Sequence, residues 1–137
     1  MTTHDVDDTV LLFRNTMRIN DGQLEGFRAA IDRAVEFARR HGPQTMVQTF
    51  VDEERMLAHS FQLYRDSDAV RAHWKLADPY IQDVMAHCRV ERFEVFGRPD
   101  ADVVAGGLRE ALGEQCPLTF PERVAGFTRL PAAHPRS

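Results

Sequence analysis

Three polar side chains in this 137-residue sequence, His73, Asn15 and His59, are the best candidates for chemistry. His73 stands beside Trp74, the only tryptophan, in a segment with helical periodicity. An imidazole titrates near pH 6.5, so His73 is suited to take a proton from a substrate hydroxyl or to hold its oxygen. The alternative is a partly buried histidine that bonds to the backbone where a helix meets a sheet.

Asn15 lies on the mostly apolar face of an expected strand, and a buried amide is costly unless it finds a hydrogen-bond partner. That partner is a ligand in one interpretation, and a neighbouring side chain or water in the other. His59 is expected in another strand, on the same face as Phe61. If the two strands are neighbours, Asn15 and His59 meet in one pocket beneath the helix that carries His73. The alternative is a simple cross-strand polar pair.

Aromatic side chains near these positions are candidates for the wall of a substrate pocket, although core packing is the competing role for each. They are Trp74, Tyr64, Phe13, Phe61 and Tyr80. Arginines on the other face of the sheet or at its rim are expected to pair with carboxylates of a partner subunit. They are Arg14, Arg18 and Arg92.

No metal site and no cofactor is predicted. His73 and His87 lie 14 residues apart, and no carboxylate–histidine cluster with ligand spacing completes a site. The sequence has no P-loop, GxGxxG, HExxH or GxSxG motif. Cys88 and Cys116 form no CxxC pair, so in a reducing compartment both are expected to be free thiols.

The elements that must position these residues follow from periodicity and turn signals. Strands are expected at 9–19, 45–51, 56–64 and 90–96, and a helix at 23–41. Ser67 is expected to cap a second helix, which carries an apolar stripe as far as Cys88, with a break or kink near Asp78, before Pro79. The resulting order β-α-β-β-α-β predicts a ferredoxin-like α+β fold over residues 9–97. Its antiparallel four-stranded sheet would carry two helices on one face.

A single domain over residues 1–137 is expected, since the tail at 98–137 does not suggest a second one. The tail is predicted to form a helix over 100–113 and then an extended arm that packs on the body or reaches a partner subunit. The other face of the sheet holds apolar residues such as Leu12 and Phe96, so a second subunit is its simplest cover.

Composition excludes several classes of protein. A net charge of −4 with 43% hydrophobic residues gives no basic footprint for nucleic acid. No apolar run approaches the roughly 20 residues that span a membrane. The acidic N-terminus is unlike a signal peptide, which makes the cytoplasm the expected location.

Two local patterns connect the sequence to a known family. MRINDGQLEGFRAAI (17–31) is a strand that runs into an Asp-Gly turn and an amphipathic helix, and HSFQLYRDSDAVRAHW (59–74) is a strand, an Arg-Asp turn and a helix with an Ala72-His73 pair. With these patterns the chain resembles the antibiotic biosynthesis monooxygenase family, of the dimeric α+β barrel superfamily, over residues 9–97. Many family members have Glu where this chain has Gln62.

The resemblance implies a homodimer whose sheets face each other, with a pocket in each subunit between sheet and helices. Family members include enzymes that oxidise anthrones or quinols with O₂ and no cofactor, and others that degrade haem or isomerise small molecules. The sequence thus suggests a cofactor-independent monooxygenase acting on an aromatic polyketide, anthrone or quinol. The alternatives are a non-catalytic binding protein, and an isomerase that shuttles protons between His59 and His73.

Overall fold

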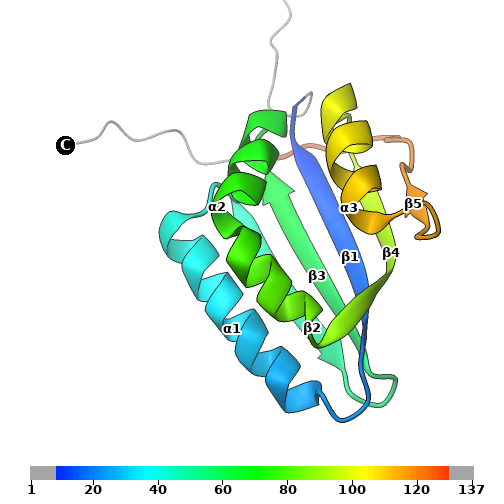
Figure 1. Ribbon diagram of the computed structural model, residues 1–137. Helices are drawn as coiled ribbons and strands as arrows, with labels where there is room; N and C mark the ends of the chain where they lie inside the picture. Colours follow the sequence, from blue (N-terminus) through cyan, green and yellow to red (C-terminus); the bar gives the residue numbers. More distant parts are fainter. Residues whose placement is uncertain (1–8, 130–137) are drawn as a thin grey trace, which may run out of the picture.

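The computed structural model describes residues 9–129 and has the expected order of elements in the body (Figure 1). The body consists of β1 (Leu11–Ile19), α1 (Leu24–His41), β2 (Met46–Asp52), β3 (Leu57–Tyr64), α2 (Ser67–Met85) and β4 (Cys88–Phe96). The tail adds a π-helical segment, η2 (Val103–Arg109), the short α3 (Glu110–Leu112) and β5 (Leu118–Thr119).

The sheet has the strand order β2-β3-β1-β4-β5, so β1 and β3 are neighbours as predicted. The first four strands in this order are antiparallel, and β5 pairs parallel to β4. The sheet is therefore mixed and has five strands in place of the expected four. The tail returns beside β4, and the backbone N–H of Phe93 donates to the carbonyl of Pro117 at 2.9 Å.

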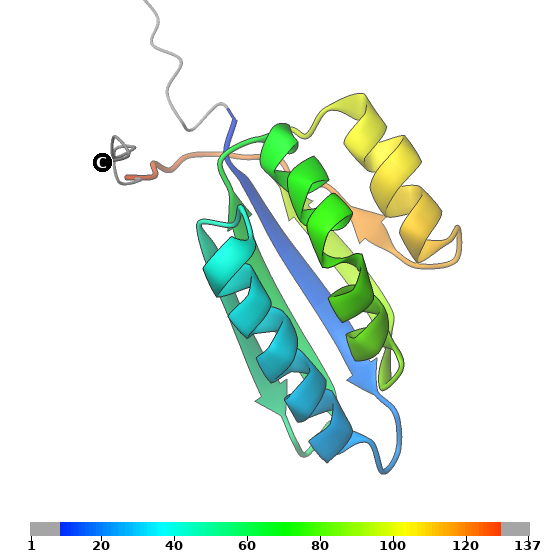
Figure 2. The ribbon, with the colours of Figure 1, turned by 60° about the vertical axis from the view of Figure 1, so that its left-hand side comes forward.

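Helices α1 and α2 cover one face of the sheet, and the tail helix lies beside α2 over β4 (Figures 1 and 2). The apolar stripe of α1 faces the sheet, with Phe27 and Ala30 buried. At the C-terminal end of α1, basic residues complement the helix dipole before Gly42 and Pro43 end the helix.

Of the break or kink expected near Asp78, the break is wrong, because the helix is continuous through Pro79. Pro79 removes one helical hydrogen bond, the one to the carbonyl of Lys75. Both residues lie on the exposed side of α2, where water can satisfy that carbonyl. At the start of the helix Asp66 is the cap, not the expected Ser67: its carboxylate accepts from the Ala69 N–H at 2.9 Å.

The buried side chains form two clusters between the sheet and the helices. One lies beneath the N-terminal half of α2 and the tail helix, and includes Leu11, Phe13, Tyr64, Val70, Phe93, Val95, Val103 and Leu108. The other lies at the opposite end, and includes Met17, Ile19, Phe27, Ala30, Ala58, Val84 and Cys88. Along β1, Phe13 belongs to the first cluster and Met17 to the second, so Asn15 lies between them.

The opposite face of the sheet carries apolar side chains, and no helix within residues 9–129 covers them (Figures 1 and 2); Phe50 is 57% exposed. The extended arm after β5 passes beside Leu12, Leu63 and Phe96 on this face (Figure 2). The arm lies beside its own body, although Val124 and Phe127 remain 93% and 69% exposed. Contact of the arm with a partner subunit stays a prediction, and residues 130–137 lie outside the described part of the chain.

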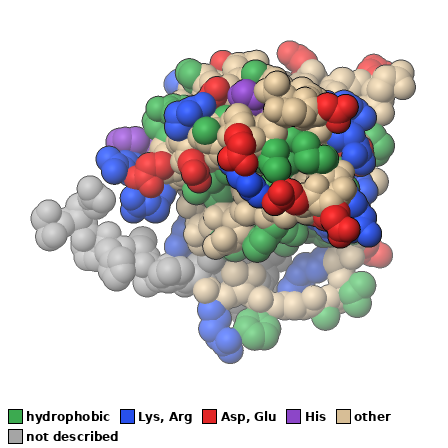
Figure 3. All heavy atoms as spheres, turned by 90° about the horizontal axis from the view of Figure 1, so that it is seen from below, with side chains coloured by type: hydrophobic (Ala, Val, Ile, Leu, Met, Phe, Trp, Pro, Cys, Tyr) green, Lys and Arg blue, Asp and Glu red, His purple; other side chains and the backbone are tan. Residues whose placement is uncertain are grey.

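The surface seen in Figure 3 shows acidic and basic side chains interspersed rather than gathered by sign. At this end Arg28 pairs with Glu25 and Glu53, and Arg55 with Asp52. None of the helices described in residues 9–129 is long and apolar enough to cross a bilayer.

Candidate functional site

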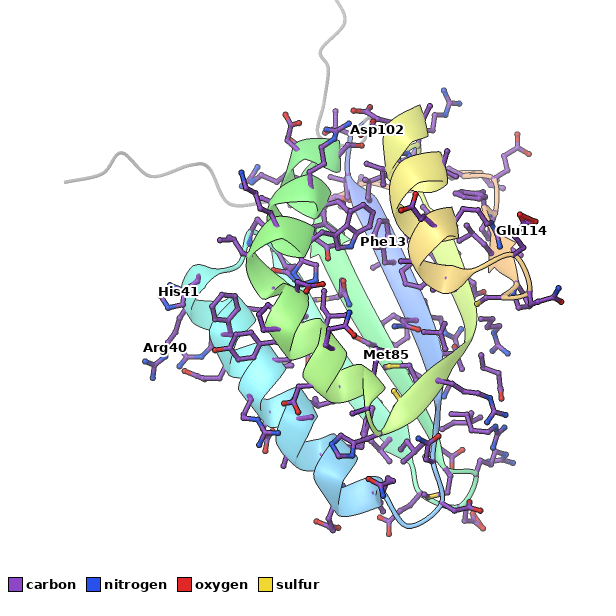
Figure 4. The ribbon with its side chains drawn as sticks, in the orientation of Figure 1. Phe13, Arg40, His41, Met85, Asp102 and Glu114 are labelled. Carbon is purple, nitrogen blue, oxygen red and sulfur yellow. The ribbon has the colours of Figure 1, made fainter. Side chains whose placement is uncertain are left out.

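A cavity of about 110 Å³ lies between the sheet and helices α1 and α2, in the gap between the two core clusters. Four polar side chains line it: Asn15, Gln44, Gln62 and His73. The remaining lining is aliphatic or thioether: Met17, Ile31, Ala34, Val35, Ala38, Val47, Ile81, Val84 and Met85. Met85 reaches it from the C-terminal end of α2, on the side that faces the sheet (Figure 4). Among these described lining residues, none carries a carboxylate, ammonium or guanidinium group.

Strand alternation directs Asn15 toward the helices. Asn15 pairs with Ser60 of β3 and Phe93 of β4, and these partners share its face of the sheet. Its Oδ1 is buried and has no hydrogen-bond partner within residues 9–129. Because an unpaired buried amide oxygen costs free energy, Asn15 is a good candidate for a ligand contact.

His73 enters the cavity from α2 and contacts Gln44, from the link between α1 and β2. The Gln44 Nε2 lies 2.9 Å from the His73 Nδ1. Because the nitrogen of the Gln44 amide faces the ring, its N–H donates to the His73 Nδ1, and the neutral imidazole carries its proton on Nε2. Burial lowers the pKa of His73 to about 4, so at pH 7 the ring is neutral. His73 thus presents an N–H donor.

Gln44 takes this position because Gly42 leaves room for it. A Cβ at Gly42 would overlap the Gln44 Oε1 and the backbone of Ala38. The Gln44 Oε1 is itself buried, and no group in the described chain donates to it. The cavity therefore has a second amide with unused hydrogen-bonding capacity, which sequence reasoning missed because nothing in the Gly-Pro-Gln run signals an inward-pointing side chain.

Tyr64, in the core, holds the side chain of Gln62, the fourth polar residue of the cavity lining. Its hydroxyl donates to the Gln62 Oε1 at 2.5 Å, and the Gln62 Nε2 donates to the Ser60 Oγ at 3.4 Å. Burial raises the pKa of Tyr64, so its hydroxyl stays protonated and continues to donate. Tyr64 is thus adjacent to the cavity and holds one of its lining residues in place.

The predicted meeting of Asn15 and His59 is wrong. His59 pairs with Thr16, not with Asn15, so its side chain lies on the opposite face of the sheet from His73. There burial lowers the pKa of His59. The charges of Arg14 and Arg92 lower it further, and that of Asp52 opposes them. Phe61 lies on this same outer face, where its ring contacts Phe50 at 6.0 Å between centroids.

The other expected wall residues also lie outside the described cavity lining. Phe13 packs between Tyr64 and Phe93 in the core, at 5.1 and 5.4 Å between ring centroids. Trp74 packs against Gly107 of η2, where a Cβ would overlap its ring. Tyr80 stacks on Phe37 at 4.4 Å, beside a shallow groove on the outer side of α1. The cavity wall is therefore aliphatic, because the aromatic side chains fill the first core cluster and the surface.

The arginines on the outer face lie near carboxylates of their own chain, and their pairing with a partner subunit stays a prediction. Arg18 Nε lies 2.7 Å from Glu91, and Arg14 Nε lies 3.6 Å from Glu94. Over the described residues, no group of His, Cys, Asp and Glu is arranged to hold a metal ion.

The chain is similar in structure to several solved proteins. No protein-family model and no curated protein sequence matches the chain. MupZ from Pseudomonas fluorescens superimposes with a TM-score of 0.68 at 19% identity, over 88% of this chain and 95% of that one. SnoaB from Streptomyces nogalater, a cofactor-independent oxygenase, gives 0.57 at 16% identity over 68% and 96%. A candidate antibiotic biosynthesis monooxygenase from Caulobacter crescentus gives 0.60 at 11% identity, over 69% and 93%.

These identities are low, so the similarity establishes the fold and leaves the reaction to be argued from the site. The resemblance that the sequence suggested is confirmed at this level: the chain has the fold of the antibiotic biosynthesis monooxygenases.

Proposed function

We propose that the chain oxidises an electron-rich phenol of the quinol or anthrone type with O₂, in the cavity beneath α1 and α2 and without a cofactor. The observation that carries this proposal is the cavity itself, a small apolar space whose polar contacts are all uncharged. The fold that the chain shares with the cofactor-independent oxygenase SnoaB supports it.

Such a reaction needs a dry site more than it needs many catalytic groups. Aliphatic side chains keep water away from the reactive intermediates of the oxidation and so limit their side reactions. For a quinol the balance is one O₂ consumed, one ring C–H converted to C–OH, the ring oxidised to the quinone, and one water released. For an anthrone, the methylene becomes a carbonyl and one water is released.

His73 is better suited to hold the substrate oxygen than to act as a strong base. Full transfer of a proton from a phenol, with a pKa of about 10, to an imidazole with a pKa of about 4 costs roughly 8 kcal/mol. That cost falls once the phenol loses an electron and becomes a strong acid. We infer that His73 donates from Nε2 to the substrate oxygen and accepts its proton only as the electron leaves.

The size of the cavity favours a quinol over an anthrone. An engineered protein cavity of about 150 Å³ holds one benzene molecule. The present cavity of about 110 Å³ therefore has room for a group of about one ring. A three-ring anthrone would extend beyond this volume.

The test is O₂ uptake with a panel of reduced quinols and anthrones, with and without a metal chelator. We expect chelator-resistant uptake above the protein-free rate, with the single-ring quinols ahead of the anthrones. His73→Gln should lower the rate by about a hundredfold. His41→Gln, which changes an exposed histidine at the end of α1, is the matched control. An unchanged rate for His73→Gln contradicts the assignment.

A binding protein without turnover is the second candidate. It is favoured by the low pKa of His73, which leaves the cavity without a strong base. The isomerase alternative loses its basis, because His59 and His73 lie on opposite faces of the sheet and cannot shuttle a proton between them.

We also propose that the chain forms a homodimer through the outer face of the sheet. The apolar side chains there include Leu12, Phe50, Phe61, Leu63 and Phe96, and the arm lies alongside only part of this surface. Apolar sheet faces are usually covered in stable folds.

A further inference from the structure

We propose that the cavity selects an uncharged ligand of about one ring and rejects its ionised analogue, with Asn15 and Gln44 as the selecting side chains. This inference depends on the proposed function only in taking the cavity as the substrate site. It concerns which molecules bind, not what happens to them.

Three charged residues that adjoin lining residues in the sequence, Arg33, Asp83 and Arg14, are turned away from the cavity and paired. Arg33 and Asp83 are next to lining residues of α1 and α2, yet they bridge the outer surfaces of the two helices at 2.8 Å. Arg14 precedes Asn15, and strand alternation places it on the outer face of the sheet with Glu94. An ion that entered the cavity would therefore lose its water without gaining a charged partner, which is strongly unfavourable.

The unused hydrogen-bonding groups fit a neutral polar ligand. The Asn15 Oδ1 and the Gln44 Oε1 are buried acceptors that receive no hydrogen bond from the described chain. Hydroxyl or amide N–H groups of a ligand satisfy such acceptors, and the His73 Nε2–H supplies a donor for the ligand's own oxygen. A carboxylate can accept from the His73 Nε2–H, but it brings no hydrogen for the two amide oxygens and finds no cation that offsets the loss of its water.

Benzamide and benzoate test this inference because they have the same size and shape and differ mainly in charge. Their dissociation constants are measured at pH 7 by ligand-observed NMR titration of the full chain. We expect benzamide to bind and benzoate to bind about a hundredfold more weakly or not at all. Ala34→Leu, which fills part of the cavity, should abolish benzamide binding and so locate it.

Two substitutions test the selecting residues. Asn15→Leu or Gln44→Leu should weaken benzamide binding by about tenfold. Gln48→Leu, at an exposed position on β2, is the matched control and should leave binding unchanged. Thermal unfolding of each variant shows that the fold is kept.

Benzoate binding as tightly as benzamide would overturn the inference, as would benzamide binding that Ala34→Leu leaves intact. Failure of both molecules to bind would overturn it as well. Benzamide selection without O₂ uptake on any quinol would keep this inference and refute the oxygenase, so the two failures are distinct.

Discussion

Burial of His73 as a neutral ring predicts a specific loss of stability in acid. The pKa of this imidazole falls from an ordinary value of 6.5 to about 4 on folding. Between these values the unfolded chain binds a proton at His73 that the folded chain does not, so stability falls as pH falls through the interval. At about 1.4 kcal/mol per pH unit, the free energy of unfolding loses about 3 kcal/mol between pH 7 and pH 4.

The measurement is urea unfolding at pH 7 and pH 4, for the wild-type chain and for His73→Gln. Other groups also titrate in this range, so the informative quantity is the difference between the two chains. The variant should lose about 3 kcal/mol less than wild type on acidification, while His41→Gln should behave as wild type. Equal acid sensitivity of the wild-type chain and His73→Gln would refute the buried neutral imidazole on which the site depends.

Three further changes test other parts of the structure. Asn15→Leu removes an unpaired buried oxygen and should raise the free energy of unfolding by about 1 kcal/mol in urea titrations while weakening ligand binding. A lower stability would show that the Asn15 amide already has a partner. Gly107→Ala places a methyl group against the Trp74 ring and should lower the free energy of unfolding by about 1–3 kcal/mol in the same assay, and a neutral effect would place the ring elsewhere. Phe50→Glu on the outer sheet face should shift the chain toward the monomer in sedimentation velocity; a wild-type monomer throughout the micromolar range would contradict the proposed dimer.

The order of elements in the body could be predicted because each one has a strong local pattern. The stripe of α1 and the alternation in β1 fix these elements and their buried faces. Pro79 led to the wrong prediction of a helix break. A proline is tolerated on the exposed side of a helix, and packing decides which side of α2 is exposed. β5 spans two residues, too few for a periodic pattern, so its pairing with β4 depends on contacts far apart in the sequence.

Only part of the site could be predicted from the sequence, for a related reason. His73 and Asn15 were found because a titratable group and an amide on an apolar face are visible in the sequence, and both line the cavity. His59 was assigned to the wrong face because a strand shows two alternating faces and does not say which meets the helices. In β3 the face that meets the helices is the more polar one, with Ser60, Gln62 and Tyr64. The more hydrophobic face, which carries His59 and Phe61, was therefore wrongly predicted to face inward.

The central claim, that O₂ reacts with a substrate in this cavity, is tested most directly by isotope labelling. A single-ring quinol that the chain consumes is turned over under ¹⁸O₂, and the product is analysed by mass spectrometry. We expect one ¹⁸O atom in the product, with the second released as water, and loss of this labelled product in Ala34→Leu. A quinone without label, or labelled product formed equally by Ala34→Leu, would contradict a monooxygenase reaction in the cavity.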